Sequence, residues 1–133
     1  MAQFQLEIIT PDGTEFEGLV DSLLVRTVEG DVEILRGHTD YFAALSVGRA
    51  RILIGTEARY AAVCGGFISV SGGAVRLVPI TFEFADGIDE ARALSAKERA
   101  TEAIESAKDD KSIEIAKAKL SRALCRLNVA SLK

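Results

Sequence analysis

The spacing of apolar residues changes near residue 85, and this change constrains the fold more than any other feature of the sequence. Before it, apolar and polar residues alternate, as in FQLEI from Phe4, and glycines separate short alternating runs. After it, the chain is rich in alanine, and apolar residues recur every three or four positions between Ile113 and Leu127. A period of two is typical of strands, and a period near 3.6 is typical of helices. We therefore predict a β domain over residues 1–85 and an α-helical domain over residues 86–133.

Frequent turn signals divide the β domain into short strands. Thr10-Pro11-Asp12-Gly13 combines the proline and glycine that a tight turn favours, and the glycine pairs Gly65-Gly66 and Gly72-Gly73 separate further alternating runs. Short strands with regular turn signals are typical of an antiparallel sandwich or barrel. We expect about nine or ten strands.

The helical domain contains start signals for two helices. Asp89 is a good N-cap for the first helix, since its carboxylate can accept from the free N–H groups of the first turn. We predict that this helix ends near Ala107 and that Lys108-Asp109-Asp110 supplies a turn and a second N-cap. A short connection between two amphipathic helices favours an antiparallel hairpin.

The hairpin is unusual in its alanine content. Ten of the residues from Ala91 to Ala130 are alanines, which favour helix but bury little apolar area when helices pack. The hairpin can therefore exist in two arrangements, folded on itself or opened along a partner. The alternative is a stable helical cap on the β domain.

Charge and hydropathy exclude two function classes. The net charge of −4, without a basic stripe, argues against nucleic acid as a partner. No apolar run approaches the ~18 residues that a spanning helix needs, so we predict no direct membrane span. The N-terminus has no basic leader and is interpreted as the first strand of a cytoplasmic protein.

Catalytic and metal-binding motifs are not evident in the sequence. GGFISVSGG, from Gly65 to Gly73, lacks the lysine and hydroxyl residue that end a P-loop. His38, the single histidine, is expected at a turn or surface. Cys64 and Cys125 fit no metal-ligand spacing and are expected to be small buried apolar residues. We predict neither an enzyme nor a metal site.

Several motifs in order resemble one family along the whole chain. They are TPDG at Thr10, VEGDVEILRGH at Val28, GGFISV at Gly65, IDEARA at Ile88 and RLNVA at Arg126. This pattern resembles subunit epsilon of the bacterial F-type ATP synthase. The resemblance implies an α+β fold, with an N-terminal antiparallel β-sandwich of ten strands and a C-terminal antiparallel two-helix hairpin.

The resemblance also implies a non-catalytic role in the rotor. The sandwich would join the gamma subunit to the c-ring at the cytoplasmic face of the cell membrane, as part of a peripheral central stalk. The hairpin would inhibit ATP hydrolysis by extending along gamma into the alpha/beta catalytic head.

IDEARA is similar to the family motif Ile/Leu-Asp-x-x-Arg-Ala, which occurs in members whose folded hairpin binds a regulatory ATP without hydrolysing it. The resemblance implies the ATP-binding residues Glu83, Ile88, Asp89, Arg92, Arg99, Arg122 and Arg126, and leaves the role of magnesium open. Helical spacing agrees, since the two arginines of the first helix are seven positions apart and those of the second are four positions apart, so both pairs can face one crevice. Guanidinium groups are suited to phosphate.

The loop after Val28 departs from the family pattern. The resemblance implies c-ring contacts by Asp31, Arg36 and His38. Glu33 replaces a family glycine, and Arg36 and Asp40 replace two prolines, which indicates a loop with mutually compensating charges. Two alternatives remain open: a coupling subunit that does not sense ATP, and a free-standing nucleotide-binding sensor.

Overall fold

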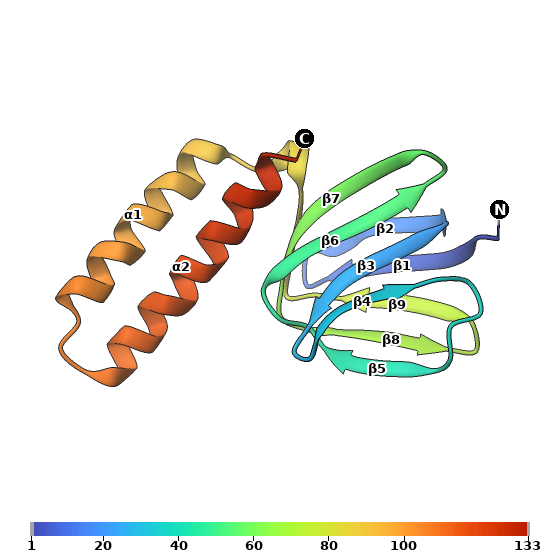
Figure 1. Cartoon of the computed structure of the whole chain (residues 1–133), viewed down its shortest axis with the longest axis horizontal. Coiled ribbons are helices and arrows are strands. Elements are labelled where there is room, and N and C mark those ends of the chain that lie inside the picture. Colours follow the sequence, from blue (N-terminus) through green and yellow to red (C-terminus); the bar gives the residue numbers. More distant parts are fainter. Residues whose placement is uncertain (1, 133) are drawn as a thin grey trace.

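Ten strands and two long helices form the structure, a computed structural model that describes residues 2–132 (Figure 1). The strands are β1 Phe4–Thr10, β2 Gly13–Val20, β3 Ser22–Thr27, β4 Gly30–Ile34, β5 Tyr41–Ala44, β6 Gly48–Ile54, β7 Glu57–Cys64, β8 Phe67–Ser71, β9 Ala74–Val78 and β10 Thr81–Phe84. A 3₁₀ turn, η1 Ala85–Gly87, leads into α1 Glu90–Ser106 and α2 Asp110–Ala130. The α+β fold class, a sandwich followed by a helical hairpin, is confirmed.

The strands form two five-stranded sheets, ordered β2-β1-β9-β8-β5 and β10-β7-β6-β3-β4. One pairing differs from the antiparallel expectation, because β1 runs parallel to β9 with Leu6 opposite Val75. The pairing places the alternating apolar side chains Leu6 and Ile8 in the core between the sheets, where both are fully buried. All other paired strands are antiparallel.

The glycine pairs occupy turns, as predicted. Gly65 and Gly66 have φ of 67° and 82°, and Gly72 and Gly73 have φ of 57° and 83°. Residues with a Cβ rarely adopt these angles, so glycine suits the β7–β8 and β8–β9 turns.

Each helix begins at an acidic N-cap, which confirms both predicted starts. An Asp89 carboxylate oxygen accepts from the Arg92 N–H at 3.0 Å, and Asp109 accepts from the Ser112 N–H at 2.7 Å. The Ser112 backbone hydrogen bond lowers the pKa of Asp109. Ala107 ends α1, and the short connection turns the chain back so that the helices pack antiparallel.

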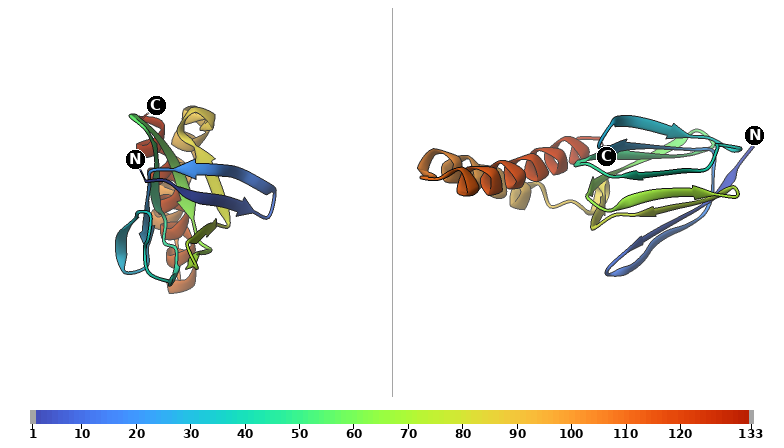
Figure 2. Two further views of the ribbon diagram at one scale, coloured as in Figure 1. Left: turned by 90° about the vertical axis from the view of Figure 1, so that its right-hand side faces the viewer. Right: turned by 90° about the horizontal axis from the view of Figure 1, so that it is seen from below.

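The hairpin projects from one end of the sandwich (Figure 2). The fully buried positions between its helices are alanines: Ala93 and Ala100 of α1, and Ala116 and Ala123 of α2. A second small apolar cluster, which we call the junction cluster, joins hairpin and sandwich through Ala62, Ala85, Ile88, Val129 and Ala130. The hairpin is therefore docked through few large apolar side chains.

Candidate functional site

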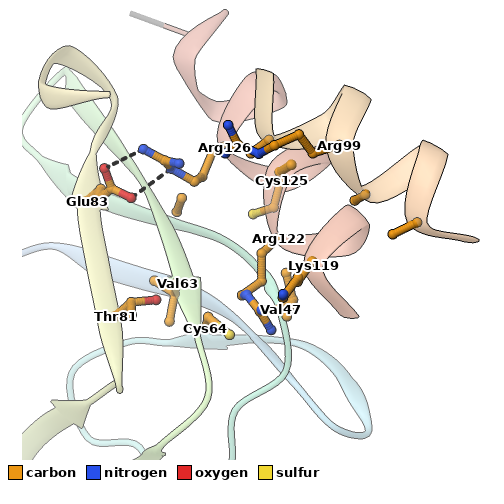
Figure 3. Close-up of a pocket in the computed structure, with 15 residues that line it drawn as sticks. Val47, Val63, Cys64, Thr81, Glu83, Arg99, Lys119, Arg122, Cys125 and Arg126 are labelled. Atoms are coloured by element: carbon orange, nitrogen blue, oxygen red, sulfur yellow. Dashed lines mark hydrogen bonds and ion pairs between the residues drawn. The ribbon is translucent and has the colours of Figure 1, made fainter. Parts of the chain in front are cut away.

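A cavity of about 620 Å³ lies between the hairpin and the sandwich. β7 and β10 line one side, and α1 and α2 line the other (Figure 3). Much of the lining is apolar, from Val47 before β6, Val63 of β7 and the alanines of both helices. Ligand sites in proteins typically have volumes of ~300–1,000 Å³.

Four cationic side chains line this cavity from the helical side. Arg99 comes from α1, and Lys119, Arg122 and Arg126 come from α2. The opposite wall supplies one carboxylate, Glu83 of β10. The excess of positive charge makes the cavity suited to an anion.

Arg126 is already engaged with Glu83. Its Nη2 donates to Glu83 Oε2 at 3.2 Å, and its Nε lies 2.9 Å from Oε1. The Nε atom is buried and makes no aligned hydrogen bond in the described chain, so one of the two contacts is electrostatic only. The ion pair links α2 to β10 directly, as Figure 3 shows.

The other three cations have no carboxylate partner in the described chain. Arg99, Lys119 and Arg122 form no salt bridge within residues 2–132. Arg99 and Arg122 are also solvent-exposed. These cations can therefore contact a phosphate without first breaking an ion pair.

The structure brings together four of the seven predicted ATP-binding residues: Glu83, Arg99, Arg122 and Arg126. The remaining three, from the IDEARA motif, do not line the cavity. Ile88 is 4% exposed in the junction cluster, Asp89 caps α1, and Arg92 is exposed on the first turns of α1. Ile88 and Asp89 therefore lie where α1 leaves the sandwich, one packed at the junction and the other capping the helix.

Sequence reasoning missed Lys119. Its spacing of three from Arg122 and seven from Arg126 places the three side chains on one face of α2, which is a signal that was available. The cysteine expectation was also incomplete, because Cys64 and Cys125 are partly exposed rather than buried and both line the cavity.

The three predicted c-ring residues lie in two places. Asp31 is in β4 beside the β3–β4 turn, whereas Arg36 and His38 lie in the β4–β5 loop, at the end of the sandwich far from the hairpin (Figure 1). His38 Nδ1 is 2.8 Å from the Thr39 carbonyl oxygen, so this nitrogen carries the proton and donates.

The charged residues between Asp31 and Asp40 find their partners elsewhere in the sandwich, not among themselves as the sequence predicted. Arg26 of β3 forms two contacts with Asp31, at 2.7 and 3.2 Å, which raise the pKa of Arg26 and lower the pKa of Asp31. Glu33 pairs with Arg51 of β6 at 2.7 Å. Asp40 accepts from the Gly72 N–H at 3.0 Å. Neighbouring strands and turns thus supply the partners, and Arg36 forms no salt bridge within the described chain.

Within residues 2–132, no group of three or more His, Cys, Asp or Glu side chains could hold a metal ion. None of the helices described is long and apolar enough to cross a membrane.

Two family models divide the chain near the sandwich–hairpin junction. Residues 3–85 match the β-sandwich domain of the ATP synthase delta/epsilon chain, and residues 86–131 match its long α-helix domain. The chain belongs to the ATP synthase epsilon chain family. The family resemblance of the motifs is therefore confirmed, and with it the non-catalytic type of subunit, since an epsilon chain is a structural and coupling component.

Relatives in the epsilon family match over nearly the full length. The ATP synthase epsilon chain of Bacillus velezensis is 37% identical over 130 residues, which are 98% of each chain. That of Halalkalibacterium halodurans is 40% identical over 132 residues, again 98% of each chain. A chain in the mitochondrial ATP synthase of Euglena gracilis, an assembly with F1 and the c-ring, has a TM-score of 0.85 at 24% identity. The alignment covers 100% of this chain and 83% of that one, and it shows a common fold.

Proposed function

We propose that this epsilon chain is a central-stalk rotor subunit that couples gamma to the c-ring of the F-type ATP synthase. Its hairpin restrains ATP hydrolysis, and ATP bound in the cavity, without being hydrolysed, holds the hairpin folded. The observation that carries the regulatory part is the cavity itself, where cations from α1 and α2 meet the β10 carboxylate.

The coupling role is supported by family membership. Full-length relatives at 37–40% identity are named ATP synthase epsilon chains, and structures with the same fold come from assemblies described as F1/c-ring and central stalk/c-ring. The sandwich would contact gamma and the c-ring, and its placement in the assembly would keep the protein at the cytoplasmic membrane face.

ATP suits the chemistry of the cavity. A triphosphate would lie against Arg99, Lys119 and Arg122, which have no carboxylate partner in the described chain. Arg126 would turn partly from Glu83 toward phosphate, and Glu83 would be free to accept from the adenine amino group or the ribose. The apolar walls would receive the base.

Binding of this kind requires the folded hairpin. The ligating groups come from α1, α2 and β10, so opening the hairpin along gamma would separate them. A ligand that contacts only one of two arrangements shifts the population toward it. High ATP would thus keep the hairpin away from the alpha/beta head, and low ATP would release it to block hydrolysis.

Calorimetric titration of the whole subunit with ATP tests the regulatory proposal. Arg122→Ala should weaken binding about ten- to hundredfold, because a hydrogen bond to a charged group contributes ~1.5–3 kcal/mol. Lys108→Ala, at the connection between the helices, is the matched control and should bind like the wild type. Absence of saturable heat, or equal affinity for the Arg122 variant, would leave a coupling subunit without ATP sensing.

Purification from the native membrane tests the coupling proposal separately. The subunit should come away with gamma and the catalytic subunits. Recovery of the protein alone would favour the free-standing nucleotide-binding sensor.

A further inference from the structure

Both cysteines of the chain line the same cavity. Cys64 is the last residue of β7, on the sandwich side, and Cys125 lies in α2, on the hairpin side (Figure 3). Both are free thiols and partly exposed. The sequence has no other cysteine, so the chain places its only two thiols on opposite walls of one cavity.

The pleat of β7 places the Cys64 thiol on the face that meets the hairpin. Ala62 and Cys64 are two residues apart, so their side chains point to the same face of the strand. Ala62 belongs to the junction cluster, and Cys125 packs against that cluster. Cys125 therefore packs beside the junction cluster, and Cys64 shares a strand face with Ala62 of that cluster.

The environment of Cys125 is consistent with this position. Burial raises the pKa of the Cys125 thiol, a hydrogen bond with the Val63 backbone partly offsets that rise, and Cys64 adds to it. Val63 and Cys64, the two residues that act on the Cys125 thiol, are the last two residues of β7 and line the same cavity.

The space between the two walls allows them to approach. A disulfide requires Cα atoms within about 7 Å of each other. The side chains that line the two walls include small ones on both, Ala62 of β7 and Ala123 of α2, beside the long cationic side chains of α2, and the cavity between the walls has a volume of about 620 Å³. Closing the disulfide therefore requires α2 to approach β7 and the long cationic side chains of the cavity, Arg122 among them, to turn outward.

We propose that Cys64 and Cys125 form a reversible disulfide that fastens the hairpin to the sandwich. The oxidant is a small disulfide such as glutathione disulfide. One protein thiolate attacks its S–S bond and releases one glutathione thiol, and the second protein thiolate attacks the mixed disulfide and releases the other. The two protein sulfurs lose two electrons, the glutathione disulfide gains them, and both protons end on the released thiols.

The disulfide would hold the folded hairpin by a route independent of ATP. Its effect on hydrolysis rests on the proposed function, because fastening the folded hairpin changes the rate of hydrolysis only if the extended hairpin is inhibitory. The formation of the bond does not rest on that function. It follows from the placement of the two thiols.

Oxidation of the whole folded subunit tests the proposal. The protein, at about 10 μM, is incubated with glutathione disulfide. The reaction is then quenched with acid, alkylated with N-ethylmaleimide and analysed by intact mass and non-reducing electrophoresis. The expected product is a monomer that has lost two hydrogen atoms and takes up no maleimide. It should form about a hundredfold faster than any disulfide dimer, because two thiols held on one folded chain have an effective concentration near the millimolar range.

Two controls separate the folded geometry from incidental reactivity. Cys64→Ser leaves one thiol, which can give only a glutathione adduct or a dimer. In denaturant the chain still joins the two thiols, so the intramolecular bond should still form, but more slowly than in the folded protein, where both thiols line one cavity. A folded protein that yields only adducts, dimers or fully alkylated monomer would overturn the proposal, as would an equal rate in the unfolded chain.

Adding ATP to the same reaction distinguishes this proposal from the proposed function. ATP in the cavity would lie between the two thiols and slow the bond. Formation of the bond at a rate unaffected by ATP would support the disulfide and contradict ATP binding in the cavity.

Discussion

The ion pair between Glu83 and Arg126 predicts that the two α2 arginines contribute unequally to ATP binding. Arg122 has no carboxylate partner in the described chain, whereas Arg126 must give up part of its contact with Glu83 before it can hold phosphate. The Glu83 side chain is 38% exposed and the Arg126 side chain is 23% exposed, so solvent screens the pair. A pair of this kind contributes under ~1 kcal/mol.

The difference in binding free energy follows from subtracting the ion pair of Arg126 with Glu83 from its contact with phosphate. A charged hydrogen bond to phosphate contributes ~1.5–3 kcal/mol for either arginine, but Arg126 first loses up to ~1 kcal/mol from its ion pair. Arg126→Ala should therefore weaken ATP binding by less than Arg122→Ala does, by a factor of up to about five. In a Glu83→Gln background the ion pair is gone, so the two alanine variants should become equal.

Arg122→Ala and Arg126→Ala are each titrated with ATP by calorimetry in the presence of Glu83 and in the Glu83→Gln background, which gives a double-mutant cycle. Circular dichroism checks that each variant keeps its helices. The cycle compares differences, so any direct contact of Glu83 with the nucleotide cancels. The reasoning is refuted if Arg126→Ala costs as much as Arg122→Ala in a folded subunit, or if the gap between them survives Glu83→Gln.

Three further expectations concern the two structural units. A chain ending at Ala85 should fold alone and bind gamma, because the main core contains residues of the sandwich and none of the helices, and circular dichroism with a gamma pull-down measures both. Removing the residues after Gly87 should raise ATP hydrolysis by the assembled synthase while coupling is retained, and unchanged hydrolysis across ATP concentrations would argue against inhibition. Because Arg26 lowers the pKa of Asp31, their pair should stabilise the fold above pH ~3.9, the ordinary Asp value, and lose its effect as the pH falls through the lower folded-state pKa. Asp31→Asn should thus slightly reduce the acid sensitivity of the melting temperature, and an unchanged acid profile would show that the exposed pair contributes nothing.

Features of the fold that depend on near neighbours in sequence were predicted well. The glycine turns at Gly65 and Gly72 and the acidic caps at Asp89 and Asp109 each depend on a few adjacent residues, whose backbone preferences are local. The parallel pairing of β1 with β9 was missed because about seventy residues separate the partners, and alternation shows that a strand has a buried face without showing which strand lies beside it.

In the candidate site, too, what depends on local spacing could be predicted, and what depends on the docking of the hairpin could not. Arg122 and Arg126 were grouped by helical spacing, and Lys119 could have been added by that rule. That Cys64 approaches Cys125 could not be read from spacing, since it depends on how the hairpin docks on the sandwich. Within the IDEARA motif, the helix start at Asp89 was predicted from local residues and is confirmed, whereas ATP binding by Ile88, Asp89 and Arg92 stays a prediction.

The small side chains between the helices bear on both proposed controls of the hairpin. Alanines at Ala93, Ala100, Ala116 and Ala123 let the hairpin pack with little apolar burial, so the folded arrangement is held by modest free energies. ATP at a hundredfold excess over its dissociation constant would stabilise that arrangement by ~2.7 kcal/mol, and this stabilisation disappears when ATP falls. A disulfide across the same walls would persist until it is reduced, whatever the ATP concentration. Because the nucleotide and the closed disulfide need the same space, the two controls should exclude each other while favouring the same folded hairpin.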